Sequence, residues 1–192
     1  QRRGQVLGHQ RLHAVEAHWP AGAPLSGRVV TRYRHGLPTQ RIEVVEASHP
    51  LPDGRGAAAA EAMLADLAQL GADALLLVLL SGGGSSLLAL PVAGVSLKEL
   101  RAVTRGLLAS GAPIAAINTV RRHLTRFSAG QVAAASAAPV VGLLLSDVVG
   151  DDLDPARTGP LAGLLDPPQV LRVERLLGPQ REREGALFRR PR

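Results

Sequence analysis

Two apolar runs and the helical patterns around them predict an α/β domain with a mostly parallel sheet. Residues 75–80 are all leucine or valine and lack the alternation of a strand that faces water on one side. Such a run is typical of a strand covered on both faces in a parallel sheet, and residues 140–145 form a second one. Segments with helical spacing alternate with these strands, which is the order of α/β folds.

Composition narrows the class of protein. The chain has 192 residues, of which 46% are hydrophobic and 2% aromatic, so it is long enough for one domain with a core of Leu, Val and Ala. It contains no cysteine, which excludes disulfides and thiolate metal sites. No apolar stretch reaches the ~20 residues that span a bilayer, and no signal peptide is recognisable. We therefore expect a cytoplasmic protein that has no membrane partner.

The formal net charge of +6 raises the question of nucleic-acid binding. The arginines gather near the two ends of the chain, and only Trp19 and Tyr33 lie near the first group as aromatic stacking partners. Clustered charge with stacking aromatics matters more for nucleic-acid binding than net charge does. We therefore expect solvated arginines and no nucleic-acid partner.

The N-terminal part contains two strands and a loop with a candidate residue. The first 24 residues give no clear assignment beyond a short helix at residues 7–17. Strands are expected at residues 27–31 and 42–46, and a loop with two prolines follows the second. Because functional residues favour loops, His49 in this loop is a candidate for facing a ligand. The alternative is a histidine that is merely exposed.

Two helices carry clear local signals. Residues 57–70 combine alanines with an apolar stripe spaced by three and four residues, and Gly71 is expected to cap this helix. Residues 96–110 begin with Ser96 and Glu99 at the spacing of a capping box, in which each side chain satisfies a free backbone amide of the first turn. Both helices are expected to pack their apolar faces on the core.

A third helix is expected from about residue 114 to 126. Asn118, Arg121 and Arg122 share one of its faces on a 3.6-residue period. A face that concentrates hydrogen-bond donors can bind a phosphorylated ligand. A solvated basic face is the alternative, and spacing alone does not separate the two.

Glycines and hydroxyls follow the first apolar run directly. Gly82, Gly83 and Gly84 expose backbone N–H groups without obstruction from a Cβ atom, and Ser81 and Ser85 flank them. Ligands of open α/β sheets bind beyond the carboxyl ends of the strands, so this loop suits a phosphate or a carboxylate. A tight turn between strand and helix is the alternative. The loop matches neither a Walker motif nor the G-x-S-x-G motif of hydrolases.

Carboxylates follow the second apolar run in the same way. Asp147 is a candidate for metal binding, for a general base or for both, while Asp151 and Asp152 either assist it or solvate the loop. Carboxylates and water suit Mg²⁺, which usually arrives with a phosphate. If the two strands are neighbours, anion-binding amides and a carboxylate face one crevice, and this combination indicates phosphoryl transfer.

Four segments, in this order along the chain, resemble the glycerate 2-kinase family, whose C-terminal part is called the MOFRL domain. They lie at residues 46–53, 81–85, 118–125 and 145–152 and read E-A-S-H-P-L-P-D, S-G-G-G-S, N-T-V-R-R-H-L-T and L-S-D-V-V-G-D-D. The resemblance extends over about residues 25–160. It implies a Rossmann-like, three-layer α/β domain and an ATP-dependent kinase that phosphorylates D-glycerate to 2-phosphoglycerate with Mg²⁺.

The resemblance also implies roles for the candidate residues. The glycine-rich loop, with His49 and Asn118, would bind substrate or phosphate, and Arg121 would balance the negative charge of the substrate. Asp147 would orient Mg²⁺ or the attacking hydroxyl, and Asp151 would be a second metal ligand. ATP and D-glycerate are then the expected partners, while the oligomeric state stays open.

Parts of the family pattern are not recognisable in this chain. The family's Gly-Lys-Ala segment and its MOFRL domain have no counterpart, and residues 128–130 replace the usual Lys-Gly-Gly. We therefore expect an unassigned segment at 1–24, an incomplete glycerate-kinase-like domain at 25–165 and an arginine-rich tail at 166–192. The alternative to an active kinase is a non-catalytic remnant that folds and at most binds a small anion.

Overall fold

The computed structural model describes residues 12–80, 84–127 and 131–144. Its elements follow in the order β1 (Gly27–Arg32), β2 (Ile42–Ala47), α2 (Gly54–Ala68), β3 (Leu76–Leu80), α3 (Gly84–Leu87), α4 (Leu97–Ala109), α5 (Ile114–His123), α6 (Gln131–Ala134) and β4 (Val140–Leu144). Helices and strands are interspersed along the chain, which confirms the predicted α/β class. None of the helices in the described ranges has the length and apolar character needed to cross a membrane.

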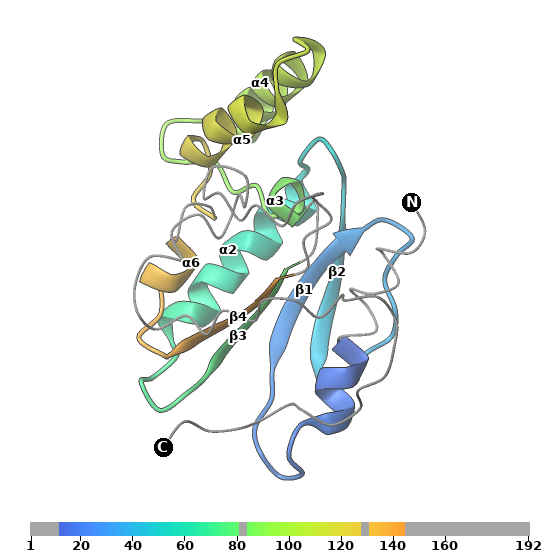
Figure 1. Ribbon diagram of the computed structural model, residues 1–192, viewed down its shortest axis with the longest axis vertical. Helices are drawn as coiled ribbons and strands as arrows, with labels where there is room; N and C mark the ends of the chain where they lie inside the picture. Colours follow the sequence, from blue (N-terminus) through green and yellow to red (C-terminus); the bar gives the residue numbers. More distant parts are fainter. Residues whose placement is uncertain (1–11, 81–83, 128–130, 145–192) are drawn as a thin grey trace, which may run out of the picture.

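All four strands of the described part pair in parallel. β1 pairs with β2 in a register that places Arg32 opposite Ala47. β3 pairs with β4 and places Leu76 opposite Val140, so the two apolar runs are neighbours, which meets the condition set for a shared crevice at their carboxyl ends. The described strands form two separate pairs and not one continuous sheet. Figure 1 shows the two pairs with α2 alongside them.

The main core lies between α2 and β3. Its buried members come from α2, from α6 and from the segments that follow α3 and α5: Ala60, Leu67, Leu90, Phe127 and Val132. Met63, Leu64 and Leu70 of the predicted stripe pack against them, so the stripe is core as expected. Leu76 and Val78, which share one face of β3, reach the same cluster but stay half-buried. The predicted burial of β3 on both faces is therefore met only in part.

α2 begins and ends earlier than its composition predicts. Asp53 is the N-cap and accepts a hydrogen bond from the Gly56 amide at 2.9 Å, so the helix forms despite the glycines of its first turn. At the other end, Gln69 caps the helix in a right-handed conformation. The predicted capping role of Gly71 is therefore wrong, because the last turn closes before the chain reaches that residue.

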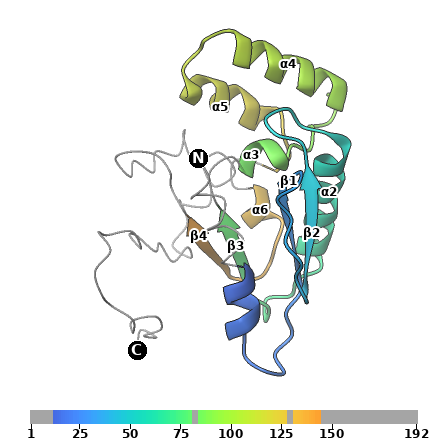
Figure 2. The ribbon, with the colours of Figure 1, turned by 90° about the vertical axis from the view of Figure 1, so that its right-hand side faces the viewer.

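α4 and α5 form a helical pair that lies beyond the carboxyl ends of β1 and β2 (Figure 2). Both hydrogen bonds of the predicted capping box are present at the start of α4. The Ser96 hydroxyl accepts from the Glu99 amide at 3.2 Å, and the Glu99 carboxylate accepts from the Ser96 amide at 2.8 Å. Gly111 has a φ of 68°, which suits the turn between the two helices.

The residues after α5 leave the helix to pair with the segment after α3. The Arg126 amide donates to the Leu90 carbonyl at 2.7 Å, and the Val92 amide donates to the Leu124 carbonyl at 3.1 Å. This pairing explains why α5 ends at His123 and not near residue 126, as the sequence predicted. It also holds the last turn of α5 close to the end of α3.

The helix at residues 12–18 supports the start of β2. Glu16 on this helix accepts hydrogen bonds from the amides of Gln40, Arg41 and Ile42 at distances between 2.7 and 3.1 Å. The bonds from Arg41 and Gln40 lower the pKa of the Glu16 carboxyl most strongly. The carboxylate therefore satisfies amides that would otherwise have no partner at the beginning of the strand.

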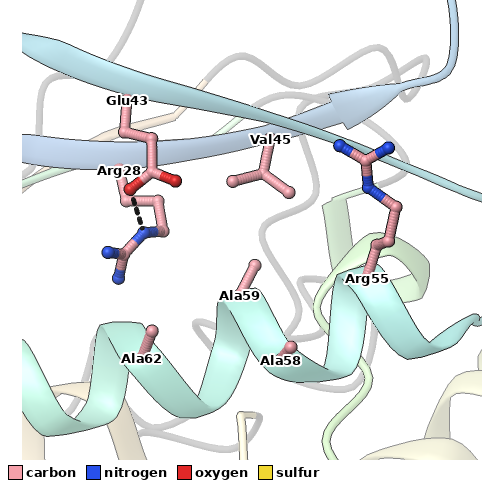
Figure 3. Close-up of a pocket in the computed structure, with 7 residues that line it drawn as sticks. All are labelled: Arg28, Glu43, Val45, Arg55, Ala58, Ala59 and Ala62. Atoms are coloured by element: carbon pink, nitrogen blue, oxygen red, sulfur yellow. Dashed lines mark hydrogen bonds and ion pairs between the residues drawn. The ribbon is translucent and has the colours of Figure 1, made fainter.

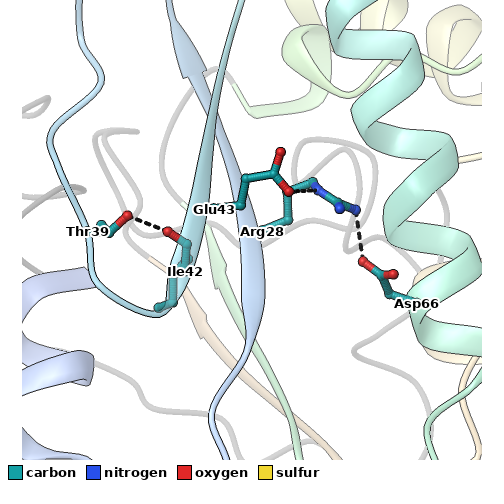
Figure 4. Close-up of polar contacts among 5 residues, drawn as sticks. All are labelled: Arg28, Thr39, Ile42, Glu43 and Asp66. Atoms are coloured by element: carbon teal, nitrogen blue, oxygen red, sulfur yellow. Dashed lines mark hydrogen bonds and ion pairs between the residues drawn. The ribbon is translucent and has the colours of Figure 1, made fainter.

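Arg28 ties β1 to its neighbours on two sides (Figure 4). Its Nε donates to the Glu43 carboxylate on β2 and its Nη1 donates to the Asp66 carboxylate on α2, both at 2.8 Å. The hydrogen bond to Glu43 raises the pKa of Arg28. At the start of β2, the Thr39 hydroxyl donates to the Ile42 carbonyl. Charge pairing therefore joins the first strand pair to the helix that covers it.

Candidate functional site

Segments that are far apart in the sequence meet where β1 and β2 end. The parallel register brings Arg32, the last residue of β1, opposite Ala47, the last residue of β2, so the loop with His49 starts beside Arg32. α3 packs against β1, and α5 lies beyond these strand ends (Figure 2). We call this region the carboxyl edge and define it by Arg32, His49, Gly84 and Arg121.

Asp53 holds the two strand ends together. Its Oδ2 accepts hydrogen bonds from the Tyr33 hydroxyl at 2.7 Å and from the Ser48 amide at 3.2 Å. Tyr33 directly follows Arg32, and Ser48 directly precedes His49. One carboxylate oxygen thus bonds the residues adjacent to two members of the carboxyl edge, and this limits how far those members can separate.

The turn that follows β1 closes around a second carboxylate. Glu46 accepts a hydrogen bond from the Gly36 amide at 2.8 Å, and this bond and one from Arg34 lower the pKa of Glu46. A Cβ atom on Gly36 would lie 2.9 Å from the Glu46 Oε1 atom, and Arg34 has a φ of 63°. The backbone conformation of the turn immediately after Arg32 is therefore restricted.

Two arginines act on the imidazole of His49 at the carboxyl edge. Desolvation lowers the pKa of His49, and the positive charges of Arg32 and Arg121 lower it further. His49 is exposed when the surface of the whole residue is considered, although desolvation is the largest cause of its lowered pKa. The ring is therefore neutral at pH 7 and offers one donor and one acceptor nitrogen.

Arg121 is half-buried on the last turn of α5, where desolvation alone lowers its pKa. In the described part of the chain, the ion pairs are those of Arg28 with Glu43 and Asp66. Arg32, also half-buried, and Arg121 therefore have no carboxylate within ion-pair distance among those residues. A guanidinium stays protonated at neutral pH, and a bound anion offsets the cost of desolvating it. The carboxyl edge is therefore suited to a small anion.

The structure places part of the predicted site at the carboxyl edge. His49 and Arg121 lie there, and Asn118 is half-buried three residues before Arg121 on α5. Gly84 is the first residue of α3, and Ser85 follows it in the same helix. Arg122 is half-buried as well, so all three residues of the predicted donor face of α5 are partly shielded from solvent.

The remaining predicted residues lie outside the described ranges, and their roles stay predictions: Ser81, Gly82, Gly83, Asp147 and Asp151. Within the described ranges, no group of three or more His, Cys, Asp or Glu side chains is placed to hold a metal ion. The proposed Mg²⁺ ligands therefore rest on the chemistry of the carboxylates after the second apolar run.

A close contact between helices fixes where the glycine-rich loop enters α3. A Cβ atom on Gly56 would lie 2.3 Å from the Leu87 carbonyl oxygen, so glycine is needed for this approach of α2 and α3. Ser86 and Leu87 are buried at the same place. Since Gly84 begins α3, this contact positions the end of the loop beside β1.

Two residues of this region were not singled out from the sequence. Arg32 looked like one of many arginines near the N-terminus, although its place at the end of a strand was a usable signal. Asp53 was assigned only to a loop, although an aspartate just before a helical segment is a preferred N-cap. Their roles at the edge depend on strand register, which the sequence does not define.

A surface groove of about 270 Å³ lies between the first strand pair and α2 (Figure 3). It is lined by strand and helix residues, none of them predicted for the site: Arg28, Glu43, Val45, Arg55, Ala58, Ala59 and Ala62. Arg28 is paired with Glu43, and Arg55 lies 5.8 Å from the centroid of the Tyr33 ring. Both cations of the groove thus interact within the chain, and the groove is a weaker anion site than the carboxyl edge.

Comparisons with known proteins identify the family of this chain. A family model described as "Domain of unknown function (DUF4147)" matches residues 8–173. A protein of Agrobacterium vitis with the provisional name hydroxypyruvate reductase is 51% identical over 148 residues, which are 77% of this chain and 34% of that protein. A glycerate 2-kinase of Pyrococcus horikoshii is 41% identical over 134 residues, which are 70% of this chain and 30% of that protein.

A solved structure has the same fold over most of the described region. The crystal structure of a glycerate kinase from Thermotoga maritima superposes with a TM-score of 0.63 at 44% identity. The match covers 72% of this chain and 36% of that chain. The chain thus spans about a third of the length of the curated relatives it matches.

Proposed function

Because this chain belongs to the DUF4147 family, the N-terminal domain of glycerate kinases, we propose that it takes part in the ATP-dependent phosphorylation of D-glycerate to 2-phosphoglycerate. The observation that carries this proposal is the half-buried Arg121, which has no carboxylate partner among the described residues and acts on His49 electrostatically. Glycerate and ATP are both anions, so they are suitable partners for such a group.

The proposed reaction is an in-line transfer of a phosphoryl group. The 2-hydroxyl oxygen of glycerate forms a bond to the γ-phosphorus of ATP, the bond from that phosphorus to the bridging oxygen breaks, and ADP leaves. Asp147 is proposed to accept the hydroxyl proton or to orient the hydroxyl. Mg²⁺, held by Asp147 and Asp151, would neutralise phosphate charge when bound, and two carboxylates suit this ion.

The residues of the carboxyl edge have binding roles in this proposal. Arg121 balances the negative charge of the reactants, and Asn118 and His49 add hydrogen bonds. The backbone amides of Gly82, Gly83 and Gly84, with the hydroxyls of Ser81 and Ser85, bind a phosphate or the glycerate carboxylate. The dominant contribution is then positioning and charge stabilisation, as in other phosphoryl transfers.

The provisional name of the Agrobacterium vitis relative raises a reductase as the second candidate. Hydroxypyruvate and glycerate are three-carbon acids that differ by two electrons and two protons, so both suit the same anion site. A nicotinamide enzyme of this fold class would carry G-x-G-x-x-G after the strand. Here Gly82 and Gly84 have the spacing of the first two glycines, but the buried Leu87 stands at the third. This departure favours the kinase.

The test is ADP formation by the purified chain with Mg-ATP and D-glycerate, after a cooperative melt has established folding. We expect turnover that depends on D-glycerate and that Asp147→Asn reduces at least a hundredfold. Asp73→Asn is the matched control, because Asp73 is exposed in the turn before β3 and lies outside the proposed site. The control should keep the turnover of the unmodified chain.

Other outcomes distinguish the alternatives. A folded chain that binds D-glycerate but forms no ADP would support a non-catalytic domain and overturn the kinase proposal for this chain. Oxidation of NADH or NADPH in the presence of hydroxypyruvate would favour the reductase. A chain that neither binds D-glycerate nor turns over would contradict both candidates.

A further inference from the structure

We infer that Arg32 forms one oxyanion-binding site with Arg121 and His49, and that this site binds either the carboxylate of the acceptor or the phosphoryl group in transfer. The inference rests on the proposed function only for the identity of the anion. Nothing in the motif pattern or in the relatives' names assigns a role to Arg32. Arg32 stands at the end of β1 and its guanidinium has no partner among the described residues, and these two observations suggest a role for it.

Backbone pairing places Arg32 beside the loop that carries His49. Arg32 is opposite Ala47 in the parallel register, and His49 follows Ala47 by two residues. The bonds of the Asp53 Oδ2 atom to Tyr33 and to Ser48 join the residue after Arg32 to the residue before His49. This arrangement comes from the strand register and from two hydrogen bonds to one carboxylate oxygen.

Arg32 itself sits in an ordered piece of backbone. Its carbonyl accepts a hydrogen bond from the His35 amide at 3.1 Å, and the Tyr33 amide donates to the Ala47 carbonyl at 3.2 Å. The Glu46 carboxylate then closes the turn through the Gly36 amide. A binding group on such a base loses little conformational entropy when an anion arrives.

The two arginines of β1 differ in their partners, although they lie on the same strand. Arg28 bonds two carboxylates, whereas Arg32 is half-buried and has no hydrogen bond or ion pair from its guanidinium among the described residues. Both Arg32 and Arg121 place positive charge near the same imidazole. Two positive charges near each other raise the electrostatic free energy of the folded protein, and an anion bound between them lowers it.

The chemistry of the group fits an oxyanion. Two guanidiniums can each offer parallel N–H donors to a carboxylate or a phosphate, and a neutral imidazole adds one further donor. A lysine at the position of Arg32 would keep the charge but lose the planar fork. We therefore expect Arg32→Met, which removes the charge, to weaken anion binding more than Arg32→Lys, which keeps the charge without the planar fork.

The test titrates the 192-residue chain with D-glycerate and, separately, with inorganic phosphate, and follows the His49 ring signals by NMR. Signals are assigned with His49→Gln. We expect Arg32→Met to weaken binding of at least one anion by tenfold or more and to raise the pKa of His49, because a neighbouring positive charge is gone. Arg32→Lys should restore the pKa of His49 but only part of the affinity. Loss for D-glycerate alone assigns the carboxylate, and loss for phosphate alone assigns the phosphoryl group.

Arg101→Met is the matched control, because Arg101 is exposed on α4. An Arg32→Met affinity equal to that of this control, or an unmodified chain whose His49 signals respond to neither anion, would overturn the inference. Thermal melts of each variant show whether a loss of binding reflects unfolding, and Arg32→Lys keeps the comparison valid if Arg32→Met does not fold. Anion binding that depends on Arg32 without ADP formation would contradict the kinase proposal and leave this inference standing.

Discussion

Two arginines, Arg28 and Arg121, have opposite environments in two regions of this molecule. Arg28, in the groove between the first strand pair and α2, bonds Glu43 and Asp66 at 2.8 Å, and its pKa is raised. Arg121, at the carboxyl edge, has no such partner among the described residues, and desolvation lowers its pKa. A guanidinium with carboxylate partners stabilises a fold, whereas a desolvated one without partners is available to a ligand.

The contrast between Arg28 and Arg121 explains why the surface groove is a poorer indicator of an anion-binding site than the carboxyl edge. The groove has volume, but its two cations already interact with Glu43 and with the Tyr33 ring. The carboxyl edge is recognised by charges that the fold leaves without a partner in the described ranges. Perturbed titration together with convergence of several elements is the stronger sign of function.

The largest expected effect comes from removing the charge of Arg121. Arg121→Met should weaken binding of D-glycerate or phosphate by at least tenfold, which corresponds to about 1.4 kcal/mol. The free energy of unfolding should change by less than about 0.5 kcal/mol, because a desolvated charge without a partner stabilises the fold little. Calorimetric titration and urea unfolding measure the two quantities. A clear loss of stability with unchanged affinity would remove the distinction between the two regions.

The control for this variant is Arg105→Met, since Arg105 is exposed on α4. It removes the same charge from the surface and should leave anion affinity within about twofold, because solvent and salt screen an exposed charge. If Arg105→Met weakens binding as much as Arg121→Met does, net charge and not the carboxyl edge controls the anion.

The reverse pattern is expected for Arg28. Arg28→Met should lower the free energy of unfolding by about 1–2 kcal/mol, since two charge-assisted hydrogen bonds are lost but both carboxylates remain largely exposed. Anion affinity should stay as it was. Urea unfolding at low and at high salt measures the effect, and the loss should shrink at high salt. Unchanged stability at low salt would show that the paired arginine does not hold the strands to α2.

Local signals made much of this fold predictable. The apolar stripe of α2 and the Ser96–Glu99 capping box depend on residues within four positions of one another, and both are confirmed. Parallel pairing of the two apolar runs was predictable from their lack of alternation. Helix ends were less predictable. α5 ends early because Leu124 and Arg126 bond a segment more than thirty residues away, and no local pattern contains that information.

The candidate site divides in the same way. His49, Asn118 and Arg121 were predictable because their residue types and motifs are visible in the sequence. Arg32 and Asp53 were missed because their importance arises from the register of β1 against β2 and from bonds between segments about twenty residues apart. The glycine-rich loop up to Gly83 and the carboxylates after residue 145 remain predictions, and the described residues only show where the loop enters α3.

The smallest effect is expected at Asp53, which bonds the strand ends and caps α2. Partial burial raises the pKa of its carboxyl, but hydrogen bonds from Gly56, Tyr33 and Ser48 outweigh this, and the pKa lies below its ordinary value of 3.8. The carboxylate therefore adds stability above pH 3.8, and this stability is lost as the pH falls through the lowered pKa. Asp53→Asn, which can still cap the helix, should cost about 0.5 kcal/mol at pH 7 and progressively less as the pH falls below 3.8.

Urea unfolding of both proteins across this pH range measures the difference, and Tyr33→Phe reports how much of it comes from the Tyr33 hydroxyl. The same variants should also weaken anion binding slightly, by about twofold, because Arg32 and the His49 loop are then held less firmly. A stability difference that does not shrink as the pH falls below 3.8 would mean that the charge of Asp53 is not its cause. Unchanged affinity in both variants would mean that the carboxyl edge keeps its geometry without this brace, and that strand register alone brings Arg32 to His49.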